Sequence, residues 1–341
     1  MRVERVVVRV PNWLGDVVLS LPALRDVRRA FPDAKLTVLA RRVVAPLYEA
    51  VPGVDVLLES KGVARDAAAL RGHYDLAVVF PNSFGTAFAA WRAGVPERWG
   101  YAADGRAPLL TRAPRIPEAT RGRSQVYYYR AMLEAVGLST EGPADAGLEC
   151  PFGWLELGAS RLVGDGPFVG INPGAAFGTA KRWLPERYAA VADVLARKTG
   201  GQVVVLGSAS ERPVGEAIAA AMRAPVTVLC GETSLPELLG ILARLDLLLT
   251  NDSGPMHLAS ALGTRVVAVY GSTDWRETAP AAGGARLLRE SVECAPCMLR
   301  DCPIDHRCMR RVSVESVASA ALEVLLPHSG SFPSATSGAV N

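Results

Sequence analysis

The chain has 341 residues, half of them hydrophobic and 21% charged, which is typical of folded globular proteins and too long for one average domain. A formal net charge of +3 is too small to indicate a nucleic-acid partner. The apolar run near residue 1 is too short for a signal peptide or a membrane span. With six cysteines in a chain of this length, we therefore expect a cytosolic protein rather than an exported one held together by disulfides.

The first half alternates between apolar runs typical of strands and longer stretches of helical spacing. A Val-rich strand is expected first, then a turn at 11–16 and a helix at 17–30. Further strands are expected at 36–39, 54–58 and 74–80. This alternation predicts an α/β fold with a parallel sheet, helices on both faces and a ligand crevice at the carboxyl ends of the strands.

The same pattern restarts after a Gly-, Pro- and acid-rich connection at 139–167. Strands are expected at 168–172, 202–206, 226–229, 247–250 and 265–270, and helices at 185–199, 235–245 and 255–262. The sequence therefore predicts two Rossmann-like, doubly wound parallel-sheet domains that face each other across a cleft. We expect the domains at 1–160 and 161–326, followed by a disordered tail at 327–341.

Three loops lie where such a fold places its ligands. In the first, 11–16, Gly15 allows a tight turn and Asp16 stands at the mouth of a helix, either as a catalytic carboxylate or as a helix cap. In the second, 172–183, small residues let backbone amides approach a phosphate and Lys181 supplies a positive charge. Neither a Walker loop nor a GxGxxG dinucleotide motif is present.

The third loop, 251–257, joins a strand to a helix whose N-terminus favours anions. Asp252, Ser253 and Gly254 form its turn, and the first two are also common helix caps. His257, one turn inside the helix, either donates a hydrogen bond to a diphosphate or is a packed histidine.

Four cysteines crowd into the cysteine segment, which we define as residues 294–308: Cys294, Cys297, Cys302 and Cys308. Their spacing matches no common zinc finger or ferredoxin pattern. We expect a structural role, either through a zinc ion or through reduced or reversibly oxidised thiols. Cys150 and Cys230 are expected to be small buried hydrophobic residues.

Eight arginines stand against three acidic residues between Arg92 and Arg130. This excess indicates either a solvated surface or a patch that faces an anionic ligand.

Taken in order, five motifs resemble glycosyltransferase family 9, and most of all its heptosyltransferase II enzymes. They are VPNWLGDVVLSLPAL at 10–24, FPNSFGTAFAAWRAGVPERWGY at 80–101, INPGAAFGTAKRWLPERYA at 171–189, TNDSGPMHLASALGTRVVAVYGSTD at 250–274 and CAPCMLRDCPIDHRCM at 294–309. The resemblance covers nearly everything from residue 6 to about 325. It implies a GT-B fold, with the acceptor held mainly by the first domain and the donor by the second.

The resemblance also implies roles for particular residues. Asp16 matches the family's proposed general base and Lys181 a contact to the donor phosphates. The donor-binding turn matches Asp252, Ser253, Gly254 and His257, and Glu211 matches a contact to the ribose. Relatives often carry a histidine at the position of Ser124 or its neighbours, which this chain lacks, so no role tied to that histidine is carried over.

The implied reaction is inverting transfer of heptose from ADP-L-glycero-D-manno-heptose to the heptosyl-Kdo2-lipid A inner core of lipopolysaccharide, without a required cofactor. The implied partners are ADP-heptose, a lipid A-linked acceptor and, transiently, the cytoplasmic face of the inner membrane. The alternatives are heptosyltransferase I or another family 9 core transferase and, from a different class, a dinucleotide-dependent oxidoreductase, since Rossmann halves serve both. A metal-dependent binding module with a degenerate transferase scaffold is a third.

Overall fold

The computed structural model describes residues 2–164, 166–282 and 284–326, so the tail expected to be disordered at 327–341 lies outside the described residues. The first half is built on a five-stranded, all-parallel sheet in the order β3-β2-β1-β4-β5. Its strands are β1 (Arg5–Arg9), β2 (Lys35–Arg41), β3 (Val56–Ser60), β4 (Leu76–Val79) and β5 (Glu97–Trp99).

Helices cover both faces of this sheet because its central strand is buried on both sides. Val6 and Val8 point into the core shared with α1 (Leu14–Ala30) and α4 (Gln125–Ala135). Val7, between them, points into the opposite core, against α2 (Val63–Leu70) and α3 (Phe84–Arg92). A continuous apolar strand with this two-sided burial is typical of parallel sheets.

The second half repeats the design with six parallel strands in the order β11-β10-β9-β6-β7-β8. The strands are β6 (Phe168–Asn172), β7 (Gln202–Val205), β8 (Val226–Val228), β9 (Leu247–Asn251), β10 (Val266–Tyr270) and β11 (Ala285–Arg289). The helices are α5 (Phe152–Ala159), α6 (Pro185–Thr199), α7 (Arg212–Ala221), α8 (Leu235–Arg244), α9 (Gly254–Ala261), α10 (Trp275–Thr278), α11 (Arg307–Arg310) and α12 (Val314–Leu325). Short 3₁₀ turns include η1 (Ala45–Ala50) and η4 (Thr179–Lys181).

The predicted doubly wound α/β architecture is confirmed in both halves, although the sequence analysis gives no range for several of its elements. Among these are the edge strands β5 and β11 and the helix α5, which lies inside the expected interdomain connection. α5 packs closely on α8 of the second half, where Gly158 faces Gly240 and neither position has room for a side chain. The expected boundary between residues 160 and 161 stays a prediction.

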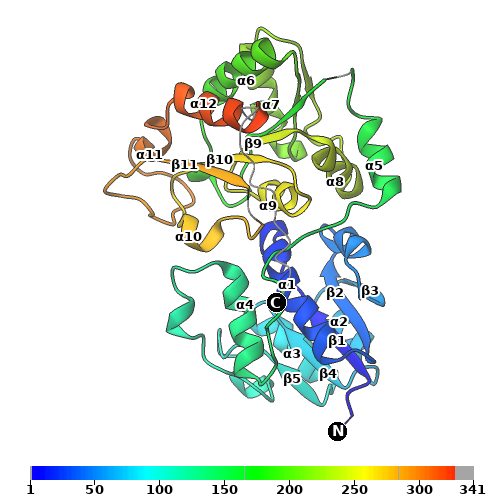
Figure 1. Cartoon of the computed structure of the whole chain (residues 1–341). Helices are drawn as coiled ribbons and strands as arrows, with labels where there is room; N and C mark the ends of the chain where they lie inside the picture. The colour runs from blue at the N-terminus through cyan, green and yellow to red at the C-terminus, as the bar shows by residue number, and fades with distance from the viewer. Residues whose placement is uncertain (1, 165, 283, 327–341) are drawn as a thin grey trace, which may run out of the picture.

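The two halves meet where α1 points at α9, as Figure 1 shows with α1 in dark blue below α9 in yellow. Two polar contacts flank this junction. The amide of Leu148 donates to the carbonyl of Ala261 at 2.7 Å, and the amide of Gly122 donates to the Glu277 carboxylate at 2.8 Å. In the parts of the chain that the structure describes, no helix combines the length and the apolar character needed to span a membrane.

Candidate active site at the junction of the two halves

The N-termini of α1 and α9 approach each other through two glycines. A Cβ on Gly15 would lie 3.0 Å from Cδ2 of the His257 ring, and a Cβ on Gly254 would lie 2.9 Å from Cβ of Leu14. Side chains at either glycine would therefore push the helices apart. This contact brings Asp16, in the first turn of α1, to the N-terminal end of α9 in the other half.

Asp16 is partly buried, and its surroundings make its carboxylate more basic. Burial raises its pKa above the usual 3.8, the charge of Lys181 lowers it, and the charge of Asp252 raises it again. The net direction is upward. Among the described residues no hydrogen bond occupies this carboxylate, and the N-cap residue of α1, Trp13, makes no side-chain cap. These facts favour a base over a cap.

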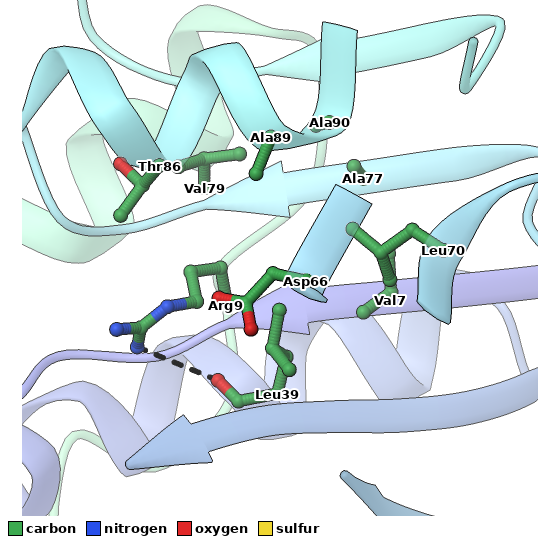
Figure 2. Close-up of a pocket in the computed structure, with 10 residues that line it drawn as sticks. All are labelled: Val7, Arg9, Leu39, Asp66, Leu70, Ala77, Val79, Thr86, Ala89 and Ala90. Carbon is green, nitrogen blue, oxygen red and sulfur yellow. Dashed lines mark hydrogen bonds between the residues drawn. The ribbon is translucent and has the colours of Figure 1, made fainter. Parts of the chain in front are cut away.

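A buried arginine shapes the loop that leads to Asp16. Arg9 ends β1, is 7% exposed, and donates from Nη2 to Oδ1 of Asn12 at 2.6 Å and from Nη1 to carbonyls of Val10 and Leu39. Figure 2 shows its side chain reaching past Leu39 along a small cavity that Asp66 also lines. Arg9 thus ties the strand end to the loop that carries Asp16.

On the opposite side of the junction, the carboxylate of Asp252 accepts hydrogen bonds from three side chains. It lies just after β9, is 4% exposed, and its Oδ2 receives the Lys181 ammonium at 2.7 Å. The same oxygen accepts from the hydroxyls of Thr273 at 2.6 Å and Thr278 at 3.1 Å. The contact with Asp252 holds the Lys181 side chain in place near the end of the 172–183 loop. Thr273 and Thr278 were not predicted, because only the folded chain brings them to Asp252.

Asn251 fixes the same loop to the strand end. Its Oδ1 accepts from the Trp183 amide at 2.9 Å and the Tyr188 hydroxyl at 2.7 Å, and its Nδ2 donates to the Pro173 carbonyl at 2.7 Å. Ser253 holds the N-cap position of α9, yet its hydroxyl pairs with that of Thr250 at 3.0 Å and makes no cap. The first amides of α9 are therefore not satisfied by the N-cap side chain, which suits an anionic ligand.

His257 is a neutral imidazole in this site. It is 4% exposed, and burial lowers its pKa to about 4, with Asp252 opposing that change and Lys181 reinforcing it. Its Nδ1 is buried without a hydrogen-bond partner among the described residues. At neutral pH the ring can donate or accept a proton in a hydrogen bond, but it carries no charge.

Glu211 lies beside the 172–183 loop, at the carboxyl edge of the second sheet. Its carboxylate accepts from the amide and hydroxyl of Ser208 at 2.7 and 2.8 Å, forming a capping box. It also lies directly against Gly174, where a Cβ would overlap it. The structure thus places Glu211 next to the candidate donor loop and leaves its ribose contact a prediction.

The arginine-rich region is divided between inner and outer positions. Arg106 is fully buried and donates to backbone carbonyls of Tyr101 and Pro81, and Arg130 is buried against Asp26 at 2.8 Å. These two arginines are structural and cannot face a ligand in solution. Others in the region remain exposed, namely Arg92, Arg112, Arg115, Arg121 and Arg123.

Asn82 and Tyr128 form a polar pair in the first half that sequence reasoning missed. Nδ2 of Asn82 donates to the Tyr128 hydroxyl at 2.6 Å, and Arg106 donates to Oδ1 of Asn82 at 3.3 Å. Burial raises the pKa of Tyr128, and the charge of Asp16 adds to that effect, so the phenol lies within electrostatic reach of Asp16. Only tertiary structure reveals this pair.

The cysteine segment packs on the loop that carries Lys181. The Ala180 amide donates to the Arg300 carbonyl at 2.9 Å, the Thr179 hydroxyl donates to Asp301 at 2.6 Å, and Nε2 of His306 lies 3.0 Å from the Ala180 carbonyl. All four cysteines of the segment, together with His306, line one mainly apolar cavity. The segment therefore braces the 172–183 loop from outside.

All six cysteines are free thiols. Cys230 is buried, as expected, whereas Cys150 is only partly buried. Over residues 2–164, 166–282 and 284–326, no group of three or more His, Cys, Asp or Glu side chains is arranged to hold a metal ion. The structure thus lends no support to the zinc alternative for the cysteine segment.

The assembled site offers complementary chemistry from its two sides. The first half contributes an available carboxylate of raised pKa, that of Asp16. The second half contributes a lysine, a neutral histidine and a helix N-terminus that favours negative charge. Such an arrangement can deprotonate a bound hydroxyl while it stabilises an anionic leaving group.

Known proteins similar in sequence and in fold extend over most of the chain. Lipopolysaccharide heptosyltransferase 2 of Salmonella typhimurium is 32% identical over 84% of this chain and 88% of the relative. Lipooligosaccharide heptosyltransferase 2 of Campylobacter jejuni is 28% identical over 94% of this chain and 98% of the relative. The structure of Escherichia coli ADP-heptose LPS heptosyltransferase II superposes with a TM-score of 0.82 at 29% identity, covering 94% of this chain and 98% of that one. The family model described as glycosyltransferase family 9 (heptosyltransferase) matches residues 63–307, and the chain belongs to this family.

Proposed function

We propose that the chain is a heptosyltransferase II, which transfers heptose from ADP-L-glycero-D-manno-heptose to the heptosyl-Kdo2-lipid A inner core of lipopolysaccharide. Family membership and the names of the relatives that span most of the chain support this activity. The observation that carries it is the junction of α1 and α9, where Asp16 of one half faces Lys181, Asp252 and His257 of the other.

In the proposed reaction Asp16 is the general base. Its carboxylate takes the proton of an acceptor hydroxyl as the acceptor oxygen forms a bond to the anomeric carbon of the heptose. The bond from that carbon to the diphosphate oxygen breaks on the opposite face, ADP leaves with the bonding electron pair, and the configuration inverts. The raised pKa of Asp16 supports this role, because a stronger base accepts the hydroxyl proton more readily.

Lys181 and the N-terminus of α9 are proposed to bind the donor diphosphate. Both supply positive charge beside the position of Asp16. Asp252 holds the Lys181 ammonium in place and keeps the local charge balanced when ADP has left. Neutral His257 adds one N–H donor, and Glu211 is proposed to accept from the ribose hydroxyls. Because these groups can stabilise the leaving diphosphate, the reaction we propose requires no metal cofactor.

The acceptor is proposed to lie on the first half. Its phosphates and carboxylates suit the exposed arginines between Arg92 and Arg123. Asn82 and Tyr128 offer hydrogen bonds to its sugar hydroxyls near Asp16. Since the acceptor is a lipid, we propose that the enzyme works transiently at the cytoplasmic face of the inner membrane.

The donor assignment is tested by the release of ADP. Purified chain is incubated with ADP-heptose, with and without heptosyl-Kdo2-lipid A, and ADP is measured by a coupled enzyme assay. We expect ADP to appear only when both substrates are present. Release of ADP without acceptor, or consumption of a nicotinamide cofactor without any need for ADP-heptose, would overturn the proposal in favour of hydrolysis or oxidoreduction.

A further inference from the structure

An aromatic stripe runs along the outside of α3. Phe84, Phe88 and Trp91 stand at positions i, i+4 and i+7, so they share one face of the helix. Their rings stack in sequence, with centroids 5.9 Å and 5.5 Å apart and interplanar angles of 18° and 28°. Phe84 and Trp91 are each 48% exposed. Three stacked rings at the surface form an exposed apolar patch, and such patches are typical of binding sites for proteins, ligands or membranes.

The neighbouring helix α2 extends this surface. A Cβ on Gly85 of α3 would lie 3.0 Å from Cγ2 of Val63, the first residue of α2, and Val63 is itself exposed. We call the surface made by Val63, Phe84, Phe88 and Trp91 the α2–α3 face. It belongs to the side of the first sheet opposite α1 and α4.

The exposed charges on α2, on α3 and on the residues that directly flank these helices are all of one sign. In the ranges 61–72 and 83–96 every exposed charged residue is basic: Lys61, Arg65, Arg71 and Arg92. The only acidic residue in these ranges, Asp66, is 7% exposed and accepts hydrogen bonds from Ser60 and the Lys61 amide at 2.6 and 2.8 Å. The face is thus an aromatic patch within a rim of positive charge.

The face adjoins the candidate acceptor region. α3 begins directly after the loop 80–83 that follows β4, and this loop carries Asn82, the partner of Tyr128. β4 pairs with β1, whose carboxyl end leads to Asp16. Phe84, the first residue of α3, and Asp16, in the first turn of α1, therefore both follow the carboxyl edge of the same sheet.

We propose that the α2–α3 face binds the surface of an anionic phospholipid bilayer, in which the lipid part of the acceptor is embedded. This inference rests on the proposed function for the identity of the acceptor. Aromatic side chains prefer the interface between headgroups and acyl chains, and basic side chains pair with anionic headgroups. A second copy of the chain fits less well, because a two-fold contact would bring the two basic rims together.

The test measures binding to vesicles of phosphatidylethanolamine and phosphatidylglycerol, with phosphatidylcholine vesicles for comparison. The rim variant Lys61→Glu/Arg65→Glu/Arg71→Glu should lose about a hundredfold or more in partition to the anionic vesicles, since each lost cation costs about fivefold. The stripe variant Phe84→Ala/Phe88→Ala/Trp91→Ala should also lose binding. Phe152→Ala, which removes a 74% exposed aromatic ring from α5, is the matched control and should bind like the parent.

A conservative variant guards against misfolding of the stripe variant, in which Phe88 is partly buried. Trp91→Phe should bind vesicles like the parent. The extent to which brominated lipid quenches the protein's tryptophan fluorescence should be much smaller in this variant than in the parent. Undiminished quenching in Trp91→Phe would place the contact at another tryptophan and overturn the proposal. So would rim and stripe variants that sediment with anionic vesicles as the parent does, or a change in oligomeric mass of these variants without a change in vesicle binding.

Transfer assays separate this inference from the proposed function. Rim and stripe variants should lose turnover on heptosyl-Kdo2-lipid A in vesicles and keep it on the water-soluble, delipidated oligosaccharide. Loss of vesicle binding by the variants, combined with a parent that transfers heptose to neither acceptor, would sink the proposed function and leave the α2–α3 face as a bilayer-binding surface. Full turnover by the variants on the vesicle-bound acceptor would instead contradict the proposal that the α2–α3 face binds the bilayer.

Discussion

Replacing Asp16 by asparagine separates a catalytic base from a structural acid. The substitution keeps the size of the side chain and removes its ability to take a proton. Positioned general-base catalysis contributes about 10²- to 10⁴-fold, so we expect kcat to fall by that factor, which corresponds to a barrier higher by about 3 to 5 kcal/mol. The KM for ADP-heptose should change little, because Lys181 and the α9 N-terminus remain.

The stability of the same variant is expected to stay equal or rise. Burial raises the pKa of Asp16, so the folded protein binds the proton more tightly than the unfolded chain does. Above the unfolded value of 3.8, the charged carboxylate therefore opposes folding, and a neutral amide removes that opposition at pH 7. If Asp16 served mainly to stabilise α1 through its dipole, neutralising it would instead cost about 0.3 to 1 kcal/mol.

The assay combines initial rates of ADP release at saturating substrates with thermal melting of the same preparation. Asp33→Asn is the matched control, since Asp33 is exposed in the same half of the molecule. It should keep the parent's rate. An Asp16→Asn variant with near-parent kcat would refute the general-base reasoning, and a lowered Tm with unchanged kcat would return Asp16 to the role of a helix-stabilising residue.

Three further predictions concern the donor side. The charge of Lys181 lowers the pKa of Asp16, and the charge of Asp252 raises it. Lys181→Met should therefore move the acid limb of the kcat–pH profile to higher pH, and Asp252→Asn should move it to lower pH. Identical acid limbs in both variants would contradict the assignment of this limb to Asp16. Burial lowers the pKa of His257 to about 4, from 6.5 in the unfolded chain. The contribution of His257 to the free energy of unfolding should therefore be complete above pH 6.5 and decrease by up to about 3 kcal/mol as the pH falls towards 4. In urea titrations across this range His257→Gln should flatten that dependence, and an unchanged slope would show that another group controls it. Changing all four cysteines of the cysteine segment to serine should lower Tm, because the segment braces the Lys181 loop, while the pH profile is kept; an unchanged Tm with lost turnover would place the thiols in the reaction.

The buried strands and long helices could be predicted because their sequence patterns are strong. β6 and α6 begin and end where the sequence predicts, and the Gly-Gly pair after α6 includes Gly200, which has the left-handed conformation typical of a helix end. β5 has only three residues and β11 carries Arg286 and Arg289 among its five residues at a sheet edge, so neither has the apolar run of a central strand. α5 has a helical face that becomes apparent only when Gly158 packs against Gly240.

The candidate site was predictable in its loops and not in its connections. Strand-to-helix turns place Asp16, Lys181 and Asp252 at carboxyl edges of parallel sheets, as the fold class requires. That Lys181 pairs with Asp252 depends on the packing of two loops separated by about 70 residues in sequence. The neutral state of His257 depends on its burial, which a single sequence does not reveal.

Product analysis with paired acceptors tests the central claim most directly. Purified chain and ADP-heptose are incubated separately with Kdo2-lipid A and with heptosyl-Kdo2-lipid A, and the products are identified by mass spectrometry. We predict the addition of one heptose to the heptosylated acceptor and little or none to the unheptosylated one. Preferred transfer to Kdo2-lipid A would instead identify heptosyltransferase I activity, and transfer to neither acceptor would contradict the proposed function altogether.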